Sequence, residues 1–198
     1  TRTKTGIDPV QTLKRALAVS CNSAFARLGV KLGADALREQ AEKFGFGTKP
    51  LSDIASVASR FPDEIDTPQT GLASIGGYDV AATPLQMAMV AAAVRNDGVV
   101  MQPYLVESVR SADLQILSQT RPSQLSVATS AANAAKLRQL MVGVVEDGTG
   151  WRAKIAGVTV GGKTGTANSD NRRTPYAWFI AWADDPDVAI CVFVQDAE

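Results

Sequence analysis

Residues 161–167 read Gly-Gly-Lys-Thr-Gly-Thr-Ala and combine one ammonium group with two hydroxyls on a short, glycine-rich segment. Lys163, Thr164 and Thr166 precede an apolar run at residues 176–183, so we predict an edge strand that carries these polar groups toward one side. Its glycines would let a ligand approach the backbone closely. A lysine charge with hydroxyl and backbone N–H donors suits a carboxylate ligand.

A phosphate-binding loop is a second interpretation of the same segment. Gly157 to Thr164 match the pattern G-x-x-x-x-G-K-[ST]. Such a loop must follow a buried strand and open into a helix whose N-terminus holds the phosphate. Residues 158–160 are β-branched, and residues 164–175 are too polar and too rich in turn formers for an apolar-faced helix. Nucleotide binding is therefore the remote alternative, beside a glycine-rich hairpin without chemistry.

Composition narrows the chemistry further. The 198 residues contain 20 Lys and Arg, 20 Asp and Glu, and no histidine. The balanced charge argues against a nucleic-acid partner. Without histidine, His-based triads and most zinc sites are excluded, so we expect no metal and no cofactor, and proton transfer must use Lys, Ser, Tyr or a carboxylate. No stretch matches a membrane span or a signal peptide, while an anchor upstream of residue 1 stays open.

The first half of the chain is predicted to be mainly helical. Asp8 and Pro9 would begin a helix that reaches about residue 19, and Asn22 would cap the next helix, which ends near Gly33. Further helices are expected at about 35–44 and at 84–95, where Pro84 follows a capping threonine. Residues 48–66 are expected to form a loop, and the pattern of residues 50–66 has no interpretation.

The second half mixes strands with one long helix. We predict a hairpin from residues 104–110 and 114–118, a helix over 131–146, and strands over 158–167, 176–183 and 188–195. This order predicts an α+β fold, with a mainly helical lobe over residues 1–98 and an α/β lobe over residues 99–198. The last strands are apolar on both faces and call for helices on both sides. We therefore expect that a final helix lies outside this chain.

Ser20-Cys21-Asn22 stands 143 positions before Lys163, and alone such a triplet is common by chance. Together with other motifs, however, it resembles the transpeptidase domain of penicillin-binding proteins. The residues that carry the resemblance are 20–26, 44–47, 83–88 (Thr-Pro-Leu-Gln-Met-Ala), 96–98, 148–150 with Ala153, and 161–167. The resemblance covers essentially the whole chain and is closest to class B enzymes, with an actinobacterial origin favoured.

This resemblance implies a penicillin-binding-protein/β-lactamase-like fold, in which an antiparallel sheet is flanked by helices beside an all-helical lobe. It implies serine acyl transfer on the D-alanyl-D-alanine stem peptides of peptidoglycan during cell-wall cross-linking, and inhibition by β-lactams. It also implies a place on the extracytoplasmic face of the bacterial membrane, anchored by a segment outside the chain. Other cell-wall synthesis proteins would be further partners.

Residue roles follow from the same resemblance. Ser20 would pass a proton to the departing amine, and Lys163 would sit beside it and favour the neutral form of an upstream lysine. The backbone N–H of Thr166 would be one oxyanion-hole donor. Lys163 would help to hold the terminal carboxylate of the ligand, and Asn22 would bond its side amide. The substrate-binding set is Asn22, Thr164, Gly165 and Thr166. Arg172, Arg173 and Tyr176 either line the cleft or, as we favour, belong to a solvated loop.

The chain departs from the family at the nucleophile. No serine has a lysine three positions later, so the Ser-x-x-Lys motif is not present, and Thr1 with Lys4 lies too near Ser20 to replace it. A fragment without the front of the domain is favoured over a domain that has lost its nucleophile. Simple carboxypeptidase action stays open, as do a β-lactam sensor and a non-catalytic scaffold. A β-lactamase is disfavoured because no glutamate matches the Glu-x-x-Leu-Asn pattern of class A enzymes.

Overall fold

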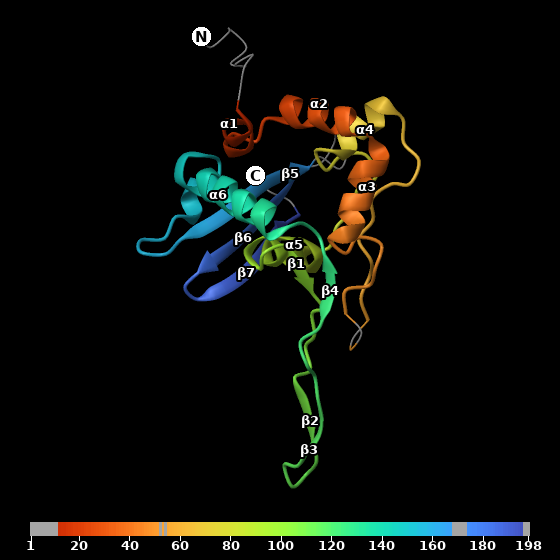
Figure 1. Ribbon diagram of the computed structural model, residues 1–198, viewed down its shortest axis with the longest axis vertical. Coiled ribbons are helices and arrows are strands. Elements are labelled where there is room, and N and C mark those ends of the chain that lie inside the picture. Colours follow the sequence, from red (N-terminus) through yellow and green to blue (C-terminus); the bar gives the residue numbers. More distant parts are fainter. Residues whose placement is uncertain (1–11, 52, 54, 168–173, 196–198) are drawn as a thin grey trace.

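The computed structural model describes residues 12–51, 53, 55–167 and 174–195 (Figure 1). The helices are α1 (Leu13–Ala18), α2 (Asn22–Leu32), α3 (Ala34–Lys43), α4 (Thr67–Ala73), α5 (Pro84–Arg95), α6 (Ala131–Asp147) and the short 3-10 helix η1 (Trp151–Ala153). The strands are β1 (Val99–Met101), β2 (Ser108–Arg110), β3 (Ile116–Gln119), β4 (Gln124–Val127), β5 (Val160–Ala167), β6 (Tyr176–Asp184) and β7 (Asp187–Val194).

The strand β5 is an edge of a three-stranded antiparallel sheet with the order β5-β6-β7. Its register places Lys163 opposite Ile180 and Thr166 opposite Ala177. The predicted edge strand is therefore confirmed, and within the described residues the far side of β5 pairs with no other strand. The structure does not support the phosphate-loop alternative. Residues Gly161 to Thr164 lie inside this strand and do not begin a helix, as a phosphate-binding loop requires.

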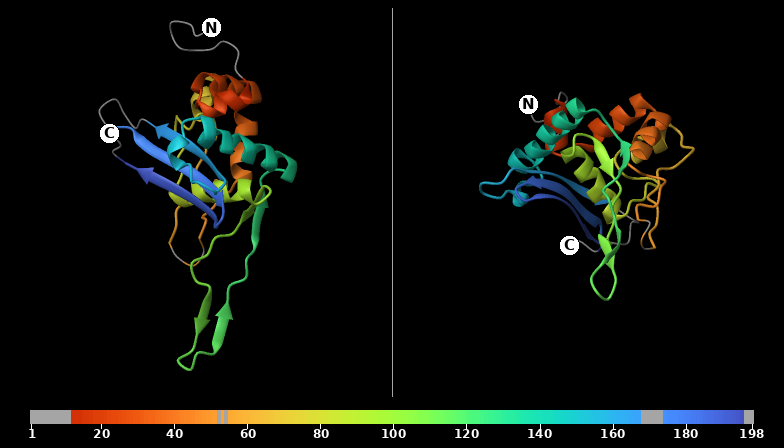
Figure 2. Two further views of the ribbon diagram at one scale, coloured as in Figure 1. Left: turned by 90° about the vertical axis from the view of Figure 1, so that its left-hand side faces the viewer. Right: turned by 60° about the horizontal axis from the view of Figure 1, so that its bottom comes forward.

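Two helices that the sequence pattern predicts, α5 and α6, pack on this sheet. α6 contacts β5, α5 contacts β6 and β7, and the two helices contact each other (Figure 2). Val94 of α5, Met141 of α6 and Trp182 of β6 form one buried apolar cluster. Arg138 of α6 adds a polar link, because its guanidinium donates to the Val94 carbonyl at 3.1 Å. The core thus joins the end of α5 and the middle of α6 to β6, the neighbour of the strand that carries the candidate site.

One face of β7 is open in the part of the chain that the structure describes. Val188, Ile190, Val192 and Val194 alternate along the strand and are each 44–49% exposed. The apolar composition of both faces predicted helices on both sides. The face that carries these four side chains has no such cover among the described residues.

Glycine at position 161 is required by close packing. A Cβ atom there would collide with the ring of Trp182, which is 3% exposed. We expect Gly161→Ala to destabilise the full-length protein by about 1–3 kcal/mol, because overpacking a rigid core displaces buried atoms. Denaturant unfolding measures this change. The control is Gly143→Ala in α6, where the nearest atom is the flexible end of Lys14 at 3.6 Å. This control should gain up to about 1 kcal/mol of helix propensity, so equal losses in both variants would contradict the packing argument.

The N-terminal helices form a second layer at one end of the molecule (Figure 1). The Thr12 side chain accepts a hydrogen bond from the Arg15 N–H and caps α1, while Asp8 and Pro9 lie outside the described residues. The predicted N-cap role of Asn22 is wrong: Cys21 holds the cap position, and Asn22 is the first residue of α2. Asn22 is therefore an exposed residue in the first turn of that helix.

Some elements have no counterpart in the sequence prediction. The helix α4 follows the loop and begins with a capping box, in which Asp66 and Gln69 exchange hydrogen bonds of 2.9 Å. The strands β1 and β4 pair antiparallel across the base of a long arm. The predicted hairpin is confirmed as β2 and β3, although both strands are shorter than expected, because the pairing covers only Ser108–Arg110 and Ile116–Gln119. The mixed helices and antiparallel sheets confirm the predicted α+β class. The lobe boundary near residue 98 stays a prediction.

Candidate active site

Lys163 and Ser20 meet despite their separation in sequence. The Lys163 Nζ donates a hydrogen bond of 2.8 Å to the Ser20 Oγ, and it also donates to the Thr164 carbonyl at 2.7 Å. Both side chains are half-buried. The contact joins the C-terminal end of α1 to the open edge of β5, so the residue pair selected from the sequence lies in one place.

Ser20 is held in an uncommon backbone conformation. It follows the C-cap of α1 with φ = 53°, in the left-handed region that favours glycine. Its N–H donates to the Leu17 carbonyl at 3.1 Å, and the next N–H, from Cys21, donates to the Ala16 carbonyl at 2.9 Å. This bonding pattern is a Schellman motif, whose left-handed position is usually glycine. A serine here gives up backbone stability, and its hydroxyl is the group that contacts Lys163.

A cavity of about 690 Å³ lies along β5. It is lined by five consecutive residues of β5, by residues of β6 and β7 with Gln195 just after them, and by residues of the helices and loops opposite the strand: Lys163, Thr164, Gly165, Thr166, Ala167, Tyr176, Trp178, Ile180, Phe193, Gln195, Phe46, Ile75, Gly76, Val80, Ala81, Ala82 and Met87. Trp178 and Phe193 pack with ring centroids 4.4 Å apart and form an apolar wall. The polar groups of the strand therefore face an apolar surface, as in many small-molecule sites.

Residues of both strand faces reach this cavity because β5 is an edge. Adjacent strand residues point to opposite faces, so Lys163 and Thr164 reach it from different sides. The Thr164 carbonyl accepts from Lys163 and so is directed away from β6. Residues two apart direct their backbone groups to the same edge of a strand, which leaves the Thr166 N–H pointing outward as well. The edge thus offers a backbone donor next to the lysine.

Burial lowers the pKa of Lys163 below its usual range, because desolvation penalises the charged ammonium. The described carboxylates do not offset this cost through an ion pair with Lys163, which instead donates to a hydroxyl and a carbonyl. A ligand carboxylate would supply the missing negative charge. The electrostatics of the cavity therefore favour an anionic ligand over a neutral one.

The remaining predicted site residues are placed as follows. Gly165 lines the cavity where an added Cβ would lie 3.1 Å from the Trp178 Cβ. Tyr176, for which a solvated loop was favoured, instead lines the cavity at the start of β6. Arg172 and Arg173 lie outside the described residues. Asn22 begins α2 two residues beyond Ser20 and is exposed toward solvent.

The helical wall of the cavity contains residues that were not predicted as part of the site. Phe46 and Met87 line it, and Gln86, which is fully buried, donates to the Phe44 carbonyl at 2.7 Å and so ties the turn that carries Phe46 to α5. The motifs 44–47 and 83–88 were noted for their resemblance only. The turn glycines Gly45 and Gly47 were the available signal, since both adopt positive φ.

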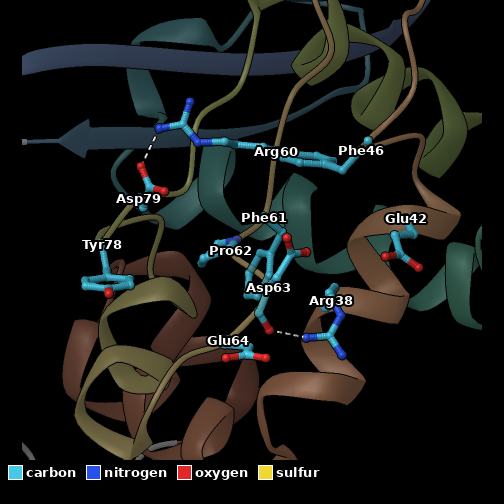
Figure 3. A pocket seen from close by; sticks show the side chains of 11 residues that line it. Arg38, Glu42, Phe46, Arg60, Phe61, Pro62, Asp63, Glu64, Tyr78 and Asp79 are labelled. Carbon is cyan, nitrogen blue, oxygen red and sulfur yellow. Dashed lines mark hydrogen bonds and ion pairs between the residues drawn. The ribbon is translucent and has the colours of Figure 1, made fainter.

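A second cavity, of about 410 Å³, lies between α3 and the loops around residues 60–64 and 78–79 (Figure 3). Arg60 pairs with Asp79 there, and Arg38 donates to the Asp63 carbonyl at 2.5 Å. Phe46 lines this cavity as well as the one along β5. None of the polar residues selected from the sequence lines the second cavity. The Arg60–Asp79 ion pair joins its two loops, and the Arg38 hydrogen bond ties the first of them to α3.

Comparison with known proteins identifies the family of the chain. The family model described as the penicillin binding protein transpeptidase domain matches residues 1–198, so the chain belongs to this family. A curated relative, peptidoglycan D,D-transpeptidase PbpA of Mycolicibacterium smegmatis, is 46% identical over 96% of the chain. The chain spans 40% of the length of that relative.

Solved structures share the fold closely. Penicillin-binding protein A from M. tuberculosis in an imipenem acyl-enzyme complex has a TM-score of 0.89 and 38% identity, over 98% of this chain and 44% of that one. Its penicillin G acyl-enzyme complex has a TM-score of 0.87 and 38% identity, over 96% and 44%. These matches confirm the predicted family and fold. Among the described residues, the helices are all too short or too polar to cross a bilayer.

Proposed function

We propose that this chain supplies the substrate-binding strand and a proton-transfer serine of a peptidoglycan D,D-transpeptidase. The observation that carries the proposal is the 2.8 Å hydrogen bond from Lys163 to Ser20 at the open edge of β5. The names of the relatives support it, because one is a peptidoglycan D,D-transpeptidase and another forms acyl-enzyme complexes with imipenem and penicillin G. The nucleophile belongs to a part of the protein outside these 198 residues.

In the proposed reaction, a serine of a Ser-x-x-Lys motif outside the chain attacks the carbonyl of the penultimate D-alanine. The neighbouring lysine takes the proton of that serine. The amide bond to the terminal D-alanine breaks, and the departing amine receives a proton through Ser20. The acyl group then passes to an amine of a second stem peptide. With a β-lactam the broken amide lies in a ring, so the leaving amine stays attached to the acyl-enzyme.

The strand β5 would bind the ligand on both sides of the reacting carbonyl. Lys163, Thr164 and Thr166 would hold the terminal carboxylate, and the open edge beside Gly165 would admit the peptide backbone. The outward N–H of Thr166 would stabilise the oxyanion together with the N–H of the nucleophilic serine; one such donor contributes about 2.7–4 kcal/mol. Asn22, at the start of α2, would bond the side amide of the ligand.

Lys163 should lose its charge at a lower pH than an exposed lysine, because burial lowers its pKa. The neutral amine dominates above that pKa, so carboxylate binding should weaken as the pH rises through it. In the full-length protein, NMR titration of lysine Cε signals, assigned by Lys163→Met, should give Lys163 a lower midpoint than Lys154, whose pKa is raised by its hydrogen bond with Glu146. The reverse order would contradict the burial argument.

The test of the proposed function is covalent labelling. The full-length protein should react with fluorescent penicillin at one serine, and peptide mapping should place that serine in a Ser-x-x-Lys motif outside residues 1–198. Slow release of the label distinguishes a transpeptidase from a β-lactamase, because a β-lactamase hydrolyses its acyl-enzyme rapidly. We expect slow release, since the sequence of this chain shows no glutamate in the class A deacylation pattern. Peptidoglycan products would separate cross-linking from carboxypeptidase action. A protein that takes no label would contradict the enzyme and favour the scaffold, whereas label without peptide products would favour the sensor.

The same proposal places the protein on the extracytoplasmic face of the bacterial membrane, where its substrate is assembled, held by an anchor outside this chain. Its ligands would be peptidoglycan stem peptides and β-lactam antibiotics, and its protein partners other components of cell-wall synthesis. Fractionation of cells that express the full-length protein tests the location. Recovery in the soluble cytoplasmic fraction would contradict it.

A further inference from the structure

Thr149 contacts both of the elements that form the candidate site. It lies in the turn between α6 and η1, and its N–H donates to the Ala18 carbonyl at 2.9 Å. Its Oγ1 lies 2.6 Å from the Thr164 Oγ1, within hydrogen-bond distance. Thr149 therefore bonds the end of α1 through its backbone and the strand β5 through its side chain.

The flanking glycines allow the turn to approach these elements closely. A Cβ atom at Gly148 would collide with the Ala18 carbonyl oxygen, and one at Gly150 would lie 3.4 Å from the Phe179 ring. The Gly150 N–H also donates to the Val144 carbonyl at 3.0 Å, which fixes the turn to the end of α6. The position of Thr149 is thus set by backbone contacts on both sides.

These contacts give the end of α1 and the strand β5 a second connection beside the site. Ala18 lies two residues before Ser20, and Thr164 follows Lys163 directly. The Lys163–Ser20 hydrogen bond joins α1 to β5 on one side, and Thr149 joins the same two elements on the other. A hydroxyl has one proton and two acceptor positions. If Thr149 donates to Thr164, the Thr164 proton is left for another acceptor, and the nearest functional one would be the ligand carboxylate.

We propose that Thr149 is a positioning residue for carboxylate recognition, whose hydroxyl donates to Thr164 and thereby directs the Thr164 proton toward the ligand. This inference rests on the proposed function, in which Thr164 binds the terminal carboxylate. Thr149 itself touches no reacting atom. Its effect is confined to ligands that carry the carboxylate.

The first test compares penicillin G with its methyl ester in the full-length protein. Thr149→Val keeps the backbone N–H and the shape but removes the hydroxyl, and it should slow acylation by penicillin G roughly 10-fold, as expected for one lost hydrogen bond. The methyl ester, which lacks the carboxylate, should be slowed less than about twofold by the same change. Thr149→Ser should restore the rate with penicillin G. Equal slowing of the acid and the ester would indicate a general structural role and would overturn the proposal.

The second test is a double-mutant cycle with Thr164→Val. If Thr149 acts through Thr164, then Thr149→Val should cause no further loss once the Thr164 hydroxyl is gone. Independent, multiplying losses would overturn the proposal. A Thr164→Val variant that slows the acid and the ester equally would instead show that the carboxylate assignment of the proposed function is wrong, and the inference about Thr149 would fall with it.

Discussion

Replacing Lys163 by alanine in the full-length protein is expected to reduce the second-order rate constant of penicillin acylation about 1,000-fold or more. The change removes the ammonium that donates to Ser20 and that would bind the ligand carboxylate, and loss of a single preorganised donor already costs about 100–1,000-fold in related acyl-transfer sites. Folding should be largely intact, because a half-buried charge with a lowered pKa contributes little to stability. Stopped-flow or gel-based labelling with fluorescent penicillin measures the rate.

The matched control is Lys154→Ala. Lys154 is an exposed lysine directly after η1 that forms an ion pair with Glu146 of α6, and its removal should leave acylation unchanged. Thr166→Val should reduce the rate far less than Lys163→Ala, because it removes a hydroxyl and keeps the outward backbone N–H. Acylation at a near-normal rate in Lys163→Ala would contradict the assignment of the β5 edge as the ligand site.

Substitution of Ser20 should separate activity from stability. Both Ser20→Ala and Ser20→Gly remove the hydroxyl, and we expect each to lower acylation about 100-fold or more, the usual contribution of a proton-transfer group. Their stabilities should differ, because residue 20 has φ = 53° at a Schellman position. An alanine there bears the left-handed penalty of about 1–2 kcal/mol, which glycine avoids. The glycine variant should therefore be more stable than the alanine variant by about 1 kcal/mol.

Thermal and denaturant unfolding of the full-length protein measure the stability difference. Equal stabilities of the two variants would show that residue 20 does not adopt the left-handed conformation in solution. Acylation that survives in both variants would remove Ser20 from the proton path while leaving the role of Lys163 open. The pair thus tests the backbone geometry and the chemistry independently.

Local sequence signals were sufficient for the longer elements. The helix α5 has the predicted bounds, because Thr83 caps it and Pro84 occupies its first turn. The strands β5 and β6 lie within two residues of prediction, because an apolar run bounded by turn formers suits a strand. The missed helix α4 has only seven residues, too few to recognise an apolar periodicity, although its Asp66 to Gln69 capping box was visible in the sequence.

Non-local pairings escaped prediction for a different reason. The strands β1 and β4 are three and four residues long and pair across the arm between them. Such short segments carry little pattern of their own, and their partner is chosen by the surrounding fold. The miss at Asn22 has a local cause: its residue type suits an N-cap, but the Schellman end of α1 places Cys21 at that position.

By itself the sequence determined which chemistry was available: a lysine and two hydroxyls on a glycine-rich strand, no histidine, and the motifs of one family. The tertiary structure decided what those groups do together. It brought Ser20 to Lys163 across 143 residues, left the outer edge of β5 unpaired among the described strands, and set Thr149 between the two elements. The reason is physical. Residue types set charge and hydrogen-bonding capacity, whereas distance, burial and the resulting pKa shift arise only when distant segments pack against each other.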